Sequence, residues 1–136
     1  MTETVTTSVS IDSLNLSAKC ESAFEFEYVD TDGKDTGIFI TVLGSQAPTV
    51  QEWIRKSLNR RRAQEAIQAK RGKEVERTVE DDEEFGNEAA AVRIVGWRGI
   101  TQEFSHELAV RLVTNNSEIR AQVFKASNDL SNFTKG

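Results

Sequence analysis

The chain has 136 residues, of which 38% are hydrophobic and 29% are charged, and its formal net charge is −5. This length fits one domain with a single modest core. The negative charge argues against a protein that binds nucleic acid over its whole surface, although a local basic patch is compatible with it. A single cysteine, Cys20, excludes a disulfide within the chain, and a single histidine, His106, leaves little material for a zinc site.

The first 20 residues are rich in serine and threonine and lack the positive and apolar regions of a signal peptide. No apolar run in the chain approaches the length of about 18 residues that a membrane span requires. We therefore expect a cytoplasmic protein without membrane contact. Residues 1–20 are predicted to form a flexible arm with one short strand, and residues 21–136 a single α+β domain.

A β-hairpin is predicted directly after the arm. In residues 23–29 aromatic side chains alternate with glutamates, which is the two-residue period of a half-buried strand. Residues 30–37 have the composition of a turn, and Asp32-Gly33 favours a tight one. Residues 38–44 are rich in β-branched side chains. Because an isolated hairpin is marginally stable in water, this one must pack on helices or on another strand.

Two helices are predicted in the middle of the chain. The first begins near residue 50, where Thr49 and Glu52 match a capping box, and it ends near Gly72. The second covers the alanine-rich residues 85–95, with Gly96 as its C-cap.

Two shorter helices are predicted to follow. Ser105 is the N-cap of the first, and Asn116 or Ser117 caps the second, on which Ile119 and Val123 repeat with the spacing of a buried helical face. The predicted fold class is therefore α+β, with an N-terminal β-hairpin packed on a mainly helical body of about four helices.

Charge is unevenly distributed along the chain. Residues 51–77 hold nine Lys/Arg against four Glu, a balance of +5, whereas residues 78–88 hold six acids and no base. Such blocks complement each other either within one chain or between neighbouring copies. We expect residues 70–84 to form a charged, flexible joint.

The charged blocks supply most of the residues predicted to contact a partner or a second copy. The three consecutive arginines from residue 60 could bind phosphates, but we favour a solvated helix face, because Trp53 is the one aromatic interleaved with them. Acids 80–84 could hold a divalent cation, but adjacent acids in one run do not point at one spot, which favours a solvated or electrostatic surface. The predicted contact residues are Arg55, Arg60, Arg61, Arg62, Asp81, Asp82, Glu83, Glu84, Phe124 and Phe133.

Catalytic chemistry is not expected. No serine lies in a nucleophile-elbow motif, and Cys20 lies in a segment predicted to be loose. The glycines lack the spacing of a loop that cradles phosphates. We therefore predict a protein that is not an enzyme and that uses no metal or other cofactor.

Trp97 is predicted to lie in a loop between helices, flanked by Gly96 and Gly99, where it forms an apolar cluster with Ile100 and Phe104. A core anchor that fixes the angle of the C-terminal helices is favoured over an exposed binding site. Both roles are compatible, because tryptophan is enriched at the centres of protein interfaces. We expect this side chain to be largely buried.

The C-terminal half carries a longer pattern around this tryptophan. An alanine-rich helix leads into Val-Gly-Trp-Arg-Gly-Ile, then a helix starts at Phe-Ser-His-Glu, and a last helix leads to Asn-Phe. The residues of the pattern are Trp97, Phe104, Ser105, Glu107, Ile119, Gln122, Val123, Asn132 and Phe133. Over residues 85–133 the chain resembles the tail assembly chaperones of long-tailed bacteriophages. The hairpin and long helix over residues 20–70 are compatible with that family.

The resemblance implies a non-enzymatic assembly factor of the host cytoplasm that corresponds to the short form of these chaperones. Such a protein coats the tape measure protein, keeps its apolar helices soluble, helps to recruit tail tube protein subunits, and associates with itself. Two other functions are compatible with the residues. A connector or decoration subunit of the virion could exchange its arm or hairpin between copies. A small nucleic-acid-binding protein could use Arg60, Arg61 and Arg62.

Overall fold

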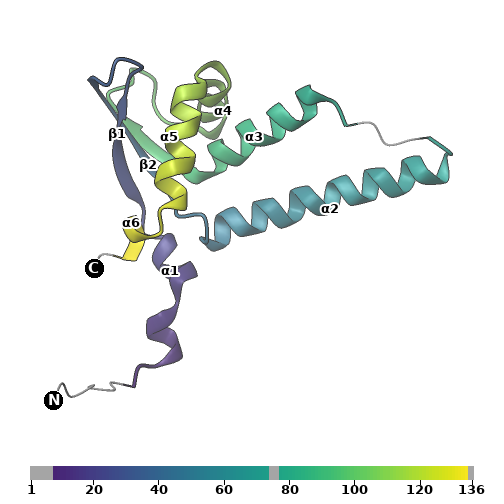
Figure 1. Cartoon of the computed structure of the whole chain (residues 1–136), viewed down its shortest axis with the longest axis horizontal. Coiled ribbons are helices and arrows are strands. Elements are labelled where there is room, and N and C mark those ends of the chain that lie inside the picture. Colours follow the sequence, from purple (N-terminus) through teal and green to yellow (C-terminus); the bar gives the residue numbers. More distant parts are fainter. Residues whose placement is uncertain (1–7, 74–76, 135–136) are drawn as a thin grey trace.

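The structure is a computed structural model that describes residues 8–73 and 77–134, in which a three-stranded antiparallel sheet packs against helices (Figure 1). The predicted α+β class, a hairpin packed on a mainly helical body, is confirmed. In chain order the elements are η1 (Ile11–Leu14), α1 (Leu16–Cys20), β1 (Phe24–Val29), β2 (Asp35–Val42), α2 (Pro48–Lys70), α3 (Val79–Arg93), β3 (Ile94–Arg98), α4 (His106–Asn115), α5 (Ser117–Asn128) and α6 (Ser131–Thr134).

The predicted hairpin is β1 and β2. The Asp30 carboxylate accepts hydrogen bonds from the backbone N–H groups of Asp32 and Lys34, at 2.9 and 3.0 Å. Gly33 adopts a φ of +79°, a conformation that favours glycine. The second strand begins earlier than predicted, because β1 pairs with β2 as far as Asp35.

β3 was missed by the sequence analysis and forms the third strand. It begins directly after α3 and runs antiparallel to β2, with Trp97 opposite Ile40 and Gly96 opposite Thr41. The predictions that Gly96 caps a helix and that Trp97 lies in a loop are therefore wrong. No turn is needed, because Ile94 passes straight into an extended conformation and the free edge of β2 supplies backbone partners.

The start of α2 also differs from the prediction. The helix begins at Pro48, and Thr49 and Glu52 lie inside it without forming a capping box. Proline fixes φ at a helical value and needs no N–H partner in the first turn, so the helix starts earlier. The Thr49 N–H instead donates to the Glu21 carboxylate at 2.9 Å, and Glu52 forms an ion pair with Lys56 at 3.0 Å.

The acidic block is helical. Thr78 Oγ1 accepts from the Asp81 N–H at 3.1 Å, and the Asp81 carboxylate accepts from the Thr78 N–H at 3.2 Å, which together form a capping box. Acids in a first helical turn also interact favourably with the helix dipole. The joint predicted over residues 70–84 is therefore wrong for residues 79–84, which belong to α3, and for Lys70, the last residue of α2.

The N-terminal segment is helical where the sequence suggested a strand. η1 is a short 3-10 helix, and α1 follows it with Asn15 as a side-chain N-cap. Cys20, at the end of α1, is fully buried, so the prediction of an arm that is loose as far as residue 20 is wrong at its end. Residues 1–7 lie outside the described residues.

The core lies where the sheet meets α3, α4 and α5, and the apolar face predicted for α5 is confirmed. Ile119 and Val123 are buried in one cluster with Ile40 and Val42 of the central strand. Ser105 caps α4 as predicted, accepting from the Leu108 N–H at 3.1 Å.

α2 is anchored at its first turns and then leaves the body (Figure 1). Val50 is fully buried, and Ile54 packs against the core. Farther along, Leu58 and Ile67 are 42% and 53% exposed, because little of the protein lies against this end of the helix. None of the described helices is both long enough and apolar enough to cross a membrane.

The two glycines around Trp97 are predicted to respond differently to substitution. Gly99 has a φ of +86°, and a Cβ there would lie 2.2 Å from the Gly37 carbonyl oxygen, whereas a Cβ on Gly96 would meet nothing within 4 Å. Gly99→Ala should lower the free energy of unfolding by about 2 kcal/mol or more. Gly96→Ala should change it by less than about 0.5 kcal/mol. Urea denaturation measures both, and equal effects would contradict this account.

Candidate functional site

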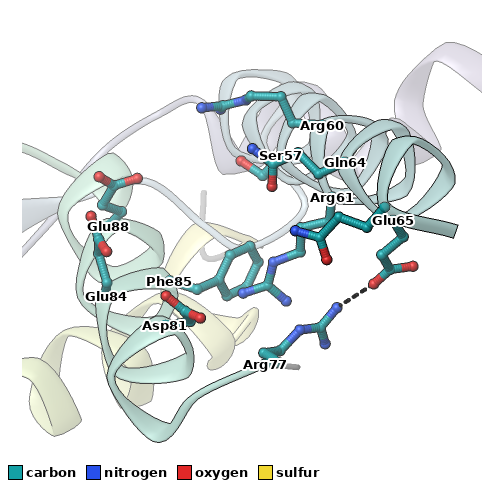
Figure 2. A pocket seen from close by; sticks show the side chains of 11 residues that line it. Ser57, Arg60, Arg61, Gln64, Glu65, Arg77, Asp81, Glu84, Phe85 and Glu88 are labelled. Carbon is teal, nitrogen blue, oxygen red and sulfur yellow. Dashed lines mark hydrogen bonds and ion pairs between the residues drawn. The ribbon is translucent and has the colours of Figure 1, made fainter. Parts of the chain in front are cut away.

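An open groove of about 330 Å³ lies between α2 and α3 and gathers half of the charged residues predicted to contact a partner (Figure 2). The two helices run as an antiparallel pair that extends away from the sheet (Figure 1). The α2 side of the groove consists of Ser57, Arg60, Arg61, Gln64, Glu65 and Gln68. The other side consists of Arg77, Asp81, Glu84, Phe85 and Glu88.

Opposite charges face each other across this groove without closing it. Within residues 8–73 and 77–134, the ion pair that joins the two sides is Arg77–Glu65, at 2.9 Å (Figure 2). Neither Arg60 nor Arg61 lies within ion-pair distance of a described acid. The blocks therefore complement each other within one chain through their general field, and their charged groups stay available to a partner.

An aromatic pair lies between the two helices, and its Phe85 ring lines the groove. Phe85 of α3 packs against Trp53 of α2, with ring centroids 5.2 Å apart, and the Arg61 guanidinium lies 4.0 Å from the Phe85 ring centroid. A cation over an aromatic face is attracted by the ring quadrupole. This contact gives Arg61 a fixed position in the groove.

Ser57 is an unusual group in this wall. It is only 6% exposed, and its hydroxyl oxygen is buried with no hydrogen-bond partner among the described residues. A buried polar group without a partner costs stability. Ser57 therefore lies at the boundary between the first turns of α2, which pack in the core, and the later turns, which line the polar groove.

The predicted charged contact residues divide into two sets. Those that line the groove are Arg60, Arg61, Asp81 and Glu84. Those that are exposed outside it are Arg55, Arg62, Asp82 and Glu83. Arg55 and Arg62 are seven residues apart, which places them on one face of α2, away from the groove.

The two predicted phenylalanine contacts belong to the protein interior. Phe133 is 5% exposed and packs edge-on against Phe24 with centroids 6.1 Å apart, so its prediction as a partner contact is wrong. Phe124 is partly buried, with the Arg93 guanidinium 4.8 Å from its ring centroid. Burial lowers the pKa of Arg93, whose guanidinium donates to the Ala89 carbonyl oxygen near the end of α3.

Trp97 combines a structural contact with an accessible face. Its ring packs edge-on against Phe104, with centroids 5.1 Å apart, and its indole N–H donates to the Gln102 carbonyl oxygen at 2.9 Å. The side chain is partly buried, less than the sequence predicted. Together with Ile100 and Leu108 it lines a second, smaller pocket.

The groove residues absent from the predicted contacts are Ser57, Gln64, Glu65, Gln68, Arg77, Phe85 and Glu88. Positions 57, 61, 64 and 68 recur at helical spacing, which would have placed them on one face of α2. That this face is turned toward α3 depends on contacts distant in the sequence. No group of three or more His, Cys, Asp or Glu side chains that could hold a metal ion occurs in the described part of the chain.

Comparison with protein-family models, with curated proteins and with solved structures finds no match to this chain.

Two buried serines provide a matched test of the groove wall. Ser57→Ala removes a buried hydroxyl that has no partner, so it should leave stability unchanged or raise it by up to about 1 kcal/mol. Ser127→Ala removes a hydroxyl that donates to the Leu43 carbonyl oxygen at 2.8 Å and should cost about 1–2 kcal/mol. Urea denaturation measures the free energy of unfolding of both variants. If Ser57→Ala lowered it as much as Ser127→Ala, the Ser57 hydroxyl would have a partner in solution.

Proposed function

We propose that this protein is a tail assembly chaperone of a long-tailed bacteriophage, which binds the tape measure protein and helps to recruit tail tube subunits during tail assembly. The proposal starts from the sequence pattern over residues 85–133 and adds a binding surface, the groove between α2 and α3.

The residues of that pattern have defined roles in the fold, which supports reading them as a unit. The Gln122 side chain binds both backbone groups of Val29, accepting from its N–H at 3.0 Å and donating to its carbonyl oxygen at 2.6 Å. The Asn132 side chain donates to the Ala126 carbonyl oxygen at 3.0 Å. The Gln122 contact holds α5 against the hairpin, the Asn132 contact joins α6 to α5, and Ser105 caps α4.

The observation that carries the proposal is the groove itself, a surface with unpaired charges of both signs on two extended helices. A tape measure helix placed there would find Arg60 and Arg61 on the α2 side and the carboxylates of Asp81, Glu84 and Glu88 on the α3 side. It would also find the ring of Phe85, the apolar side chain that lines the groove. Burying apolar surface of a partner would keep it soluble. Mixed charge favours a protein partner over nucleic acid, which calls for a surface of one sign.

Charge reversal within the groove should abolish capture of the tape measure protein. Co-expression with the tape measure protein of the same phage should yield a soluble complex with the wild-type chain. Arg60→Glu/Arg61→Glu should reduce the co-purified amount at least about tenfold, because like charges then line both sides. The measurement is the ratio of the two proteins after affinity purification.

The matched control is Arg55→Glu/Arg62→Glu, which makes the same charge change on the same helix but outside the groove. Capture should be retained in this variant. An equal loss of tape measure capture in both variants would indicate a general charge effect and contradict the groove assignment. A tape measure protein that stays insoluble with the wild-type chain would reject the function. Stoichiometric presence of the chain in purified virions would favour a structural virion protein instead.

A further inference from the structure

The N-terminal segment presents apolar side chains that the protein does not cover. Ile11 is 87% exposed, the highest value among the large hydrophobic residues described, and Leu14 is 66% exposed. Both lie on η1, which contributes no buried residue to the core. In a 3-10 helix the side chains at positions i and i+3 are eclipsed, so Ile11 and Leu14 form one apolar knob.

This knob is held in a defined place. Asn15 caps the next helix by accepting from the Ala18 N–H at 3.1 Å, and that helix ends at the buried Cys20. Figure 1 shows the segment leaving the body beside α1 and α6, on the side away from α4. The knob is therefore presented outward from one end of the molecule.

A matching apolar pocket lies at the other end of the molecule. Its apolar wall consists of Trp97, Ile100, Leu108 and Leu112, and its polar lining consists of Arg111, Gln102, Asn115 and Asn116. Because the indole N–H of Trp97 is already bonded to a carbonyl oxygen, the ring leaves no polar group unpaired in the pocket. Its volume of about 160 Å³ suits a branched aliphatic side chain, since a cavity of about 150 Å³ holds a benzene molecule.

We propose that residues 9–14 of one copy dock into the Trp97 pocket of a second copy, with the Ile11–Leu14 knob against the indole and Asp12 paired with Arg111. The Asp12 carboxylate and the Arg111 guanidinium carry opposite charges. Within the described residues neither side chain has an ion-pair partner in its own chain. The partner copy thus supplies the group that fills the pocket.

The arrangement also determines the kind of assembly. The knob and the pocket are different surfaces at opposite ends of one chain, so a chain cannot fill its own pocket. Each added copy exposes a new knob or a new pocket, which gives a heterologous, head-to-tail contact. This inference does not depend on the proposed function, because neither surface includes the groove between α2 and α3.

Removal of the knob tests the contact in the full-length protein. Sedimentation velocity from micromolar to millimolar concentration should show reversible growth of the wild-type chain. Ile11→Ser/Leu14→Ser should raise the dissociation constant at least about tenfold, because the apolar contact is lost. Ile67→Ser, which removes an exposed isoleucine on distal α2, should leave it unchanged. Both variants change exposed residues, so circular dichroism should confirm an unaltered fold.

A charge exchange tests the pairing itself. Asp12→Arg and Arg111→Asp should each raise the dissociation constant severalfold, and the double variant should restore it. In a Trp53→Phe background the emission of Trp97 should shift to shorter wavelength as the protein associates. A wild-type chain that stays monomeric, equal loss in Ile67→Ser, or a double variant without rescue would each overturn the proposal.

Discussion

The short segment that follows β2 holds the fold together. In three consecutive residues the backbone binds three separate parts of the chain. The Leu43 N–H donates to Arg93 at the end of α3, and the Gly44 N–H donates to Cys20 at the end of α1. The Ser45 N–H donates to Ser127 near the end of α5. A Cβ on Gly44 would lie 2.6 Å from the Cys20 sulfur, so only glycine allows this approach. The positions of the sheet, the N-terminal helices and the C-terminal helices are thus set at one point.

Local signals in the sequence were sufficient for much of this fold. The hairpin was predicted from alternation and turn chemistry, and the Ser105 cap from its position before an apolar helical face. These features depend on residues close in the chain, which explains the success. The first turn of α2 shows the limit, because two capping signals overlap there and Pro48 overrides the one formed by Thr49 and Glu52.

The errors share a different cause, which is that contacts distant in sequence determined the outcome. β3 is five residues long, contains Gly96 and follows an alanine-rich helix, so no local period identifies it. It is a strand because β2 offers an edge. The groove is a second example. Both charged blocks were visible in the sequence, but their antiparallel placement depends on core packing and on contacts distant in the sequence, such as Phe85 against Trp53. One error was avoidable, since Thr78 and Asp81 have the spacing of the capping box that starts α3.

The length of α2 affects which substitutions this protein can tolerate during evolution. With 23 residues the helix is about 35 Å long, and only its first turns contact the core. The residues that pack in the core and those that line the proposed binding groove therefore lie in separate stretches of the same helix. Substitutions of the exposed residues beyond Ser57 should therefore cost little folding free energy. Substitutions before it affect the core directly. Under the proposed function, such a division lets the outer turns adapt to a changing partner while the fold is kept.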